Sequence, residues 1–380
     1  MMKPAGKRAL AVGFLAAFLT AGAFAQVKSG SCWPSYRGDP ALTGSTPVTL
    51  KPPFRLLWTF STGDAVKSSA VICGGLVCIG SDDGFLYALD QTGKLKWKFN
   101  AATSIEAPPL IVAKTVIAGS LEGILFCLDA QSGALRWKYA TDGQISGSAN
   151  FIALTSRTSV MVGSYDYNLH CLDAATGKLI WKYESGNYIN GAPAVGGQVV
   201  LFGGCDGFLH LVNTTTGKAE KKIEVGTYIP ASACILDGRA WLGNYDGEFF
   251  CIDLRSEKIL WKTSGGGPFL SSPAVSGSRV VTASQDRNIW CFEAATGKAL
   301  WKFKTLGKAD ASPVIAGKHV VAASGDGRLY VLDIVTGKKV WEYEIGSAIV
   351  STPAVTADLI VVGAQDGKIY CFGPLPHPSP

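Results

Sequence analysis

The stretch DGRLYVLDIVTGKKVW, residues 326–341, carries the pattern that decides the fold of this chain. An acidic residue and a glycine open a run of largely apolar residues, a T-G-K turn follows, and a second short run ends on a tryptophan. Alternating apolar runs of about four to eight residues are typical of buried β-strands, and the turn glycine allows the positive φ of a tight connection. The stretch therefore predicts two antiparallel strands joined by a short turn.

The same pattern recurs along the chain. Its acidic anchors are Asp83, Glu122, Asp166, Asp206, Asp246, Asp286, Asp326 and Asp366, and their successive numbers differ by 39, 44, 40, 40, 40, 40 and 40. A period of about 40 residues with four short β-runs in each unit is typical of β-propeller blades. We therefore predict an all-β chain with eight blades. An open solenoid is the competing architecture, but it would need capping units at its ends.

The last copy of the pattern is incomplete. In most copies a tryptophan stands at the fifteenth position after the anchor, as Trp341 does after Asp326, but the same position after Asp366 lies past the C-terminus. A solitary β-run, FRLLWTF at residues 54–60, contains Trp58, and the interval from Trp58 to Asp83 equals that from Trp301 to Asp326. We predict that this N-terminal strand completes the eighth blade and hides the last open edge of the ring.

The N-terminus has the pattern of a secretory signal peptide, with a basic start, a short apolar run and a small-x-small site that ends at Ala25. The run is too short for a transmembrane helix, and a buried N-terminal helix is the alternative. No cysteine follows the site directly, so we expect no lipid anchor and a soluble periplasmic or secreted protein. The predicted division is a signal peptide at 1–25, a lead-in segment at 26–53, one propeller at 54–373 and a proline-rich tail at 374–380.

The charge of the chain is modest. The formal net charge is +6, and the predicted signal peptide contains three of the positive residues and no acidic one, which leaves about +3 scattered along the mature chain. Such a balance argues against nucleic acid or a membrane surface as the partner.

The blade pattern A-L-D-x-x-T-G-K-x-x-W resembles the repeat of pyrroloquinoline-quinone (PQQ) enzymes and of their cofactor-free relatives. Among these, it is most similar to the BamB-type periplasmic propellers of outer-membrane assembly. CWPSYRGDPALTG, residues 32–44, is similar to the lead-in of such proteins. The resemblance implies that the repeat tryptophans dock on the neighbouring blade, near the turns that contain Asp90, Asp129, Asp173, Asp253 and Asp333. These tryptophans are Trp58, Trp97, Trp137, Trp181, Trp261, Trp301 and Trp341.

One copy departs from the pattern, because Lys221 stands where a tryptophan is expected. Trp241 occupies a slot that holds smaller residues in the other blades. We expect Trp241 to fill the space of the absent indole at the contact between blades 4 and 5.

The cysteines and anchors are expected to be structural. Their positions predict packing residues rather than disulfides, because five of them share one strand slot: Cys127, Cys171, Cys251, Cys291 and Cys371. Cys73 and Cys78 flank a two-residue turn and are not direct cross-strand partners, whereas Cys32, Cys205 and Cys234 remain open. The repeated anchors predict turns rather than a metal ring, and the four histidines share no metal-ligand spacing.

If the chain is an enzyme, the resemblance implies a PQQ- and Ca²⁺-dependent alcohol dehydrogenase. Such an enzyme needs residues that hold the cofactor and oxygen ligands for the metal. Family members with that activity are usually longer, and many carry adjacent cysteines. Here no two cysteines are adjacent, and the one irregularity is four extra residues in ALTSRTS, 153–159. We expect a non-catalytic scaffold with a protein partner in the cell envelope and no catalytic, cofactor or metal residue, although the absent anchor departs from BamB-type factors. The dehydrogenase and a small-ligand or peptide sensor are the alternatives.

A binding surface is predicted at the central channel. One slot near the start of each inner strand varies from blade to blade, next to a steadily apolar slot; it holds Lys67, Glu106, Ser146, Asn190, Pro230, Leu270, Asp310 and Val350. We expect this slot to face the channel, where it could hold a small ligand or peptide, and Tyr165 and Tyr245 to add to the same rim. Solvated variation at a loop end is the alternative.

Overall fold

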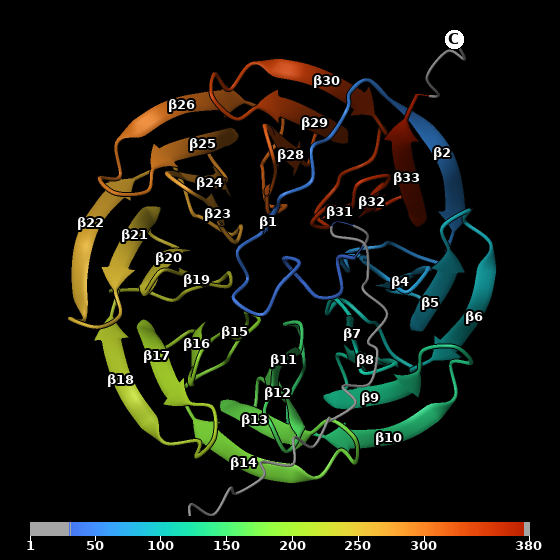
Figure 1. Ribbon diagram of the computed structural model, residues 1–380, viewed down its shortest axis with the longest axis vertical. Coiled ribbons are helices and arrows are strands. Elements are labelled where there is room, and N and C mark those ends of the chain that lie inside the picture. The colour runs from blue at the N-terminus through green and yellow to red at the C-terminus, as the bar shows by residue number, and fades with distance from the viewer. Residues whose placement is uncertain (1–29, 31, 376–380) are drawn as a thin grey trace, which may run out of the picture.

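The computed structural model describes residue 30 and residues 32–375 of the chain, and within these residues it contains strands and no helix. No helix that is long and apolar enough to span a membrane is found in this part of the chain. The strands form eight sheets arranged as blades around a central axis (Figure 1). The predicted all-β, eight-bladed propeller is confirmed. The predicted signal peptide at 1–25 lies outside the described residues, as does most of the predicted tail.

Each blade contains four antiparallel strands, numbered outward from the axis. Blades 1 to 3 consist of β3 (Val71–Cys73), β4 (Leu76–Gly80), β5 (Phe85–Asp90) and β6 (Leu95–Asn100); β7 (Leu110–Val112), β8 (Thr115–Gly119), β9 (Ile124–Asp129) and β10 (Leu135–Ala140); and β11 (Asn150–Ala153), β12 (Thr158–Gly163), β13 (Asn168–Asp173) and β14 (Leu179–Glu184). Blades 4 and 5 consist of β15 (Ala194–Gly196), β16 (Val199–Gly203), β17 (Phe208–Asn213) and β18 (Ala219–Glu224); and β19 (Cys234–Leu236), β20 (Arg239–Gly243), β21 (Glu248–Asp253) and β22 (Lys258–Ser264).

Blades 6 to 8 consist of β23 (Ala274–Ser276), β24 (Arg279–Ser284), β25 (Asn288–Glu293) and β26 (Ala299–Lys304); β27 (Val314–Ala316), β28 (His319–Ala323), β29 (Arg328–Asp333) and β30 (Lys339–Glu344); and β31 (Ala354–Val355), β32 (Ile360–Gly363), β33 (Lys368–Pro374) and β2 (Phe54–Ser61). The short β1 (Ser45–Thr46) pairs in parallel with β27.

The N-terminal strand β2 is the outermost strand of blade 8. It pairs antiparallel with β33, and Trp58 lies directly opposite Cys371, as Trp137 lies opposite Cys127 in blade 2. The first and last strands of the propeller therefore share one sheet, so that blade 8 has the same four strands as its neighbours.

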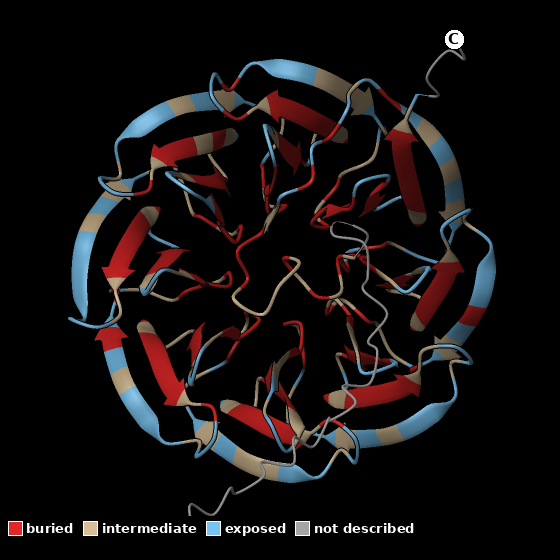
Figure 2. Cartoon of the chain, in the orientation of Figure 1, coloured by how far each residue is buried: buried red, intermediate tan, exposed pale blue. Residues whose placement is uncertain are grey.

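The buried residues follow from the way blades pack. The second and third strands of every blade are buried on both faces, whereas the outermost strands alternate between exposed and half-buried residues (Figure 2). Each blade has a neighbour on both sides, so apolar residues on both faces of its inner strands are removed from water.

The repeat tryptophans lie on the outermost strands and contact the next blade. Six of them donate an indole N–H to a backbone carbonyl of the following blade at 2.9–3.1 Å; they are Trp58, Trp97, Trp137, Trp181, Trp261 and Trp301. Each of the six indoles covers the turn glycine of that blade, where a Cβ would lie 2.5–2.7 Å from the ring. Trp341 instead packs edge-on against Phe54 and Phe372. A glycine is therefore required under each of the six rings for steric reasons as well as for its positive φ.

The junction between blades 4 and 5 replaces this tryptophan–glycine pair by an ion pair. The ammonium of Lys221 donates to the carbonyl of Leu254 at 3.2 Å, in the place of the bond that an indole makes at six other junctions. The turn position that is glycine in the neighbouring blades holds Glu257, whose carboxylate lies 2.9 Å from the Lys221 ammonium. The two departures from the repeat therefore compensate each other directly.

The expectation for Trp241 is wrong. Trp241 lies opposite Cys251, which in turn lies opposite Trp261, so the three side chains share one face of blade 5. Trp261 bonds to the Ala294 carbonyl of blade 6, so this face contacts blade 6 and not blade 4. Spacing along the chain defines the repeat slot of Trp241 but does not show which face of the blade the slot belongs to.

The lead-in segment closes one end of the central channel. It passes once around the axis (Figure 1) and its backbone carbonyls accept hydrogen bonds from all eight blades. The donors are the backbone N–H groups of Ile72, Ile111, Val195, Ile235, Val275, Ile315 and Ala357 in blades 1, 2 and 4 to 8, and the side-chain amide of Asn150 in blade 3. These bonds satisfy donors at the inner ends of the blades that would otherwise need water.

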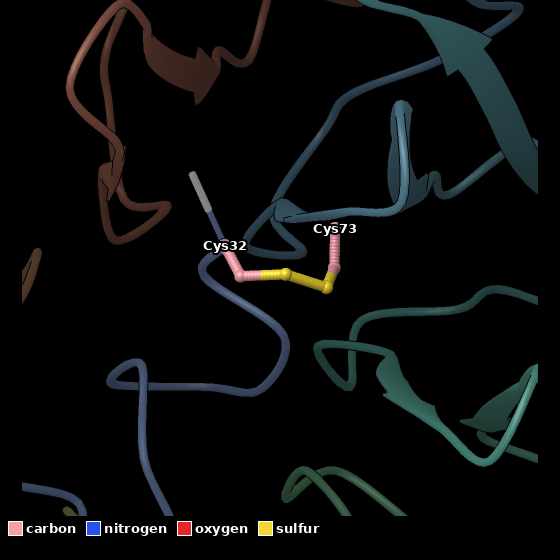
Figure 3. The surroundings of a disulfide bond; sticks show 2 residues. All are labelled: Cys32 and Cys73. Carbon is pink, nitrogen blue, oxygen red and sulfur yellow. A yellow bond between two sulfur atoms is a disulfide. The ribbon is translucent and has the colours of Figure 1, made fainter. Parts of the chain in front are cut away.

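A disulfide between Cys32 and Cys73 ties this segment to the inner strand of blade 1 (Figure 3). The two Cα atoms are 4.5 Å apart, within the usual range of about 4.4–6.8 Å. The sequence left Cys32 open and gave Cys73 no partner, because it did not show where the lead-in lies. The other eight cysteines are free, including all five of the shared strand slot, which are buried. Burial raises the pKa of the Cys371 thiol to about 12, so such groups stay protonated and act as apolar residues.

Candidate functional site

A polar cavity of about 190 Å³ lies at the centre of the ring, at the end of the channel opposite the lead-in. The eight residues of the variable slot all line it, one from each blade, where the chain enters the inner strand: Lys67, Glu106, Ser146, Asn190, Pro230, Leu270, Asp310 and Val350. Because these positions share one place in the repeat, the propeller symmetry brings together residues that lie far apart in sequence, from Lys67 to Val350.

A second ring of small residues lies two positions further along each entering segment. Its members are Ser69, Pro108, Ser148, Ala192, Ser232, Ser272, Ser312 and Thr352, and they also line the cavity. Their hydroxyls join neighbouring blades, as where the Ser272 N–H donates to the Ser312 hydroxyl at 2.9 Å and the Thr352 N–H to that of Ser69 at 2.8 Å. The hydroxyls thus hold the inner ends of the blades in register while they present polar atoms to the cavity.

Tyr36 of the lead-in forms part of the cavity floor. Its hydroxyl lies 3.1 Å from the hydroxyls of both Ser272 and Ser312. The lead-in therefore does more than close the channel, because it also supplies a side chain to the site. Sequence reasoning missed Tyr36, since nothing in its local pattern places it under the ring.

On one side of the cavity one positive charge is paired with two negative charges. The ammonium of Lys67 lies 2.8 Å from a carboxylate oxygen of Glu106 and 2.8 Å from one of Asp82. Hydrogen bonds from these two carboxylates, Asp82 first, raise the pKa of Lys67 above its ordinary value. This ammonium stays charged and is held by two anions, so it has little capacity left for an anionic ligand.

Asp310 is in a different position on the opposite side. Its carboxylate accepts a hydrogen bond from the Gln285 amide at 3.1 Å, and none of the described cationic groups lies within ion-pair distance of it. The neighbouring blades place Leu270 and Val350 on either side of it in the ring. The cavity thus contains one carboxylate without an ionic partner, flanked by apolar residues.

Tyrosines gather beside the cavity mouth on blades 3 to 5. Tyr165 stacks on Tyr188 with ring centroids 4.7 Å apart, and Tyr245 stacks on Tyr228 at 4.4 Å. Tyr188 and Tyr228 stand two residues before Asn190 and Pro230, both of which line the cavity. Tyr165 and Tyr245 themselves do not line the cavity; each stacks on a tyrosine that stands two residues before a lining residue. The sequence pointed to two of these four rings, and their stacking partners were missed although they share one repeat slot.

The acidic anchors bind within their own blades. Six accept a hydrogen bond from an aromatic or histidine side chain four residues later, at 2.6–3.3 Å: Asp83 from Tyr87, Asp166 from His170, Asp206 from His210, Asp286 from Trp290, Asp326 from Tyr330 and Asp366 from Tyr370. In the described part of the chain no group of three or more histidine, cysteine or acidic residues is placed to hold a metal ion. The repeat tryptophans lie at the outer rim, away from the cavity.

Several proteins of known structure have a fold similar to that of this chain. BamB from Moraxella catarrhalis has a TM-score of 0.73 and 19% identity, covering 84% of this chain and 100% of its own. A europium-containing methanol dehydrogenase has a TM-score of 0.75 and 14% identity over 91% of this chain and 98% of its own. The quinohemoprotein alcohol dehydrogenase from Comamonas testosteroni has a TM-score of 0.76 and 14% identity over 92% of this chain and 82% of its own. At such identities these likenesses show the fold alone, and they confirm the resemblance to PQQ-like propellers.

No curated protein matches the sequence. The family described as "Beta-alanine-activating enzyme, beta-propeller" matches residues 145–374, which run from blade 3 to blade 8 and make up more than half of the chain. The chain therefore belongs to this β-alanine-activating enzyme β-propeller family.

Proposed function

We propose that this protein is a non-catalytic binding propeller of the periplasm or cell envelope, which receives a segment of a protein partner at the cavity mouth. The observation that carries the proposal is a channel closed by the lead-in at one end, with a ring at the other end that differs in every blade. The four stacked tyrosines beside the mouth supply flat apolar area for a partner chain. The Cys32–Cys73 disulfide supports an oxidising compartment.

The chemistry of the cavity favours a basic side chain from that partner. Asp310 offers a carboxylate without an ionic partner, and Leu270 and Val350 offer apolar contact for an aliphatic stem. The Lys67 ammonium does not oppose this, because Glu106 and Asp82 already neutralise it. Tyrosine faces near the mouth add cation–π attraction for a lysine or arginine.

The residues of the cavity do not fit PQQ and Ca²⁺. A volume of about 190 Å³ is below the range of about 300–1,000 Å³ that is usual for ligand pockets. PQQ carries three carboxylates, but the single ammonium of the ring is already bound to two acidic side chains. Calcium takes about six to eight oxygen ligands. The ring contains two carboxylates, on Glu106 of blade 2 and Asp310 of blade 7, and they lie on opposite sides of the cavity, so they do not form one calcium site.

A thermal-shift titration with PQQ and Ca²⁺ checks this part of the proposal. We expect the melting temperature of the mature protein to stay unchanged and the purified protein to show no quinone absorbance. A saturable rise, which corresponds to about 2.7 kcal/mol of linkage at a hundredfold excess over Kd, would instead support the dehydrogenase alternative.

A peptide titration tests the basic side chain. The probe is acetyl-Gly-Arg-Gly-amide, and its matched control is the same peptide with citrulline, which has nearly the same shape but no charge. We expect the arginine peptide to bind with a Kd of about 1 mM, as suits one side chain, and Asp310→Asn to weaken it about tenfold or more. Glu184→Gln, which removes an exposed carboxylate from the outer strand β14, should have no effect.

Two results would contradict the proposal. Equal binding of the citrulline peptide would show that the charge of the side chain does not contribute to binding. An unchanged Kd in Asp310→Asn would show that the peptide does not contact Asp310 in the cavity.

A further inference from the structure

The irregular connection of blade 3 creates a second pocket. In the neighbouring blades two residues join the first and second strands, but in blade 3 four residues, 154–157, lie between β11 and β12. The longer connection is closed by a hydrogen bond from the Leu154 N–H to the Arg157 carbonyl at 2.8 Å. It borders a pocket of about 300 Å³ at the junction of blades 2 and 3. Strand 1–2 connections lie at the end of the blades opposite the cavity mouth, so this pocket is separate from the central site.

Two guanidinium groups line this pocket, together with the hydroxyl residues Thr115, Ser156 and Thr158. Arg136 projects from β10, and one of its nitrogens donates to Asp129 at 2.6 Å. Arg157 comes from the inserted connection. The remaining lining residues are Ala113, Asp173, Ala174 and Ala175.

The Arg157 guanidinium is the unusual group. Its Nε is buried and has no hydrogen-bond partner among the described residues, and no ion pair within that part of the chain includes this side chain. A buried donor without an acceptor costs about 1–3 kcal/mol, and more when the group is charged. Asp173 is the nearby anion, but one of its oxygens already accepts the N–H and the hydroxyl of Thr176.

The other junctions do not repeat this arrangement. The residue that precedes the repeat tryptophan, or Lys221 in blade 4, is Arg136 only in blade 2; elsewhere it is Leu57, Lys96, Ile180, Glu220, Leu260, Leu300 or Val340. Because the insertion and Arg136 meet at one junction, the two arginines are not a requirement of the blade structure. A pair of guanidinium groups with hydroxyls beside them is suited to bidentate recognition of a carboxylate or a phosphate.

We propose that the pocket between blades 2 and 3 is a binding site for a small oxyanion, in which Arg157 and Arg136 hold a carboxylate or phosphate group and the hydroxyls of Ser156 and Thr158 contact its remaining oxygens. The pocket volume is sufficient for a small organic acid or a phosphate ester. This site is independent of the binding proposed for the central cavity.

Titrations with inorganic phosphate and with citrate, at an ionic strength held constant with sodium chloride, test the proposal on the full-length mature protein. We expect saturable binding of at least one of them, and Arg157→Gln should weaken it about tenfold or more. Arg157→Lys should restore only part of the affinity, because an ammonium lacks the paired donors of a guanidinium. The matched control is Arg55→Gln, which removes an exposed arginine from β2.

The two probes distinguish the source of the anion, since a phosphate site should prefer phosphate and a carboxylate site citrate. Arg136→Gln is a second variant in case Arg157→Gln does not fold. The proposal is overturned if neither anion binds the unaltered protein saturably, or if Arg157→Gln and Arg55→Gln bind equally well.

Discussion

Gly44→Ala should lower the free energy of unfolding by about 3–5 kcal/mol, a large loss for one added methyl group. Gly44 has a φ of +61°, where an alanine costs about 1–2 kcal/mol. A Cβ at this position would also collide with the guanidinium of Arg37. Arg37 is fully buried and cannot give way, because its Nη2 donates to the carbonyls of Pro273 at 2.9 Å and Pro313 at 2.6 Å.

Gly197→Ala is the matched control for this effect. Gly197 has nearly the same φ, +63°, but a Cβ there would meet no atom within 4 Å. We expect it to lose only the conformational cost of about 1–2 kcal/mol. Urea denaturation of both variants measures the difference, and equal losses would mean that the lead-in yields around Arg37 and is not a rigid part of the ring.

Gly44→Ala should also affect peptide binding at the central cavity. Tyr36 of the cavity floor precedes Arg37 directly, and its hydroxyl contacts Ser272 and Ser312 of the same two blades. A displaced lead-in should therefore weaken peptide binding as well as lower stability, whereas Gly197→Ala should leave binding unchanged.

The repeat made the fold predictable from sequence, because every blade must present the same turn and the same buried strand. Asp326 to Trp341 alone predicts two strands, and eight copies at a period of about 40 residues, with the last copy completed by the N-terminal strand, favour a ring. The variable slot was predictable for the same reason, since a symmetric ring brings equivalent positions to one axis. Lys67 and Asp310 accordingly line one cavity.

The lead-in could not be predicted in this way because it has no repeat. Its carbonyls bond to a different blade at almost every step, so neither its path nor the Cys32–Cys73 disulfide has a periodic signal. The stacking of Tyr188 on Tyr165 was missed for another reason. It joins two loops of adjacent blades, and spacing along the chain does not show which loop tips meet.

The junction of blades 4 and 5 allows a direct test of why the repeat pairs tryptophan with glycine. Lys221→Trp alone should destabilise the protein by about 2–3 kcal/mol, because Glu257 has a side chain where each other docked indole covers a glycine. Glu257→Gly alone should change stability little. It removes an exposed ion pair worth about 0–1 kcal/mol and relieves a φ of +62° in a residue with a side chain.

The double variant should be at least as stable as the unaltered protein. With glycine at 257, the indole of Lys221→Trp can donate to the Leu254 carbonyl, which the Lys221 ammonium now occupies. We expect a coupling energy of about 3 kcal/mol between the two substitutions, measured by urea denaturation of all four proteins. Additive losses would mean that the junction cannot take the form of its neighbours, in which case the lysine and glutamate hold blades 4 and 5 at a spacing that an indole does not fit.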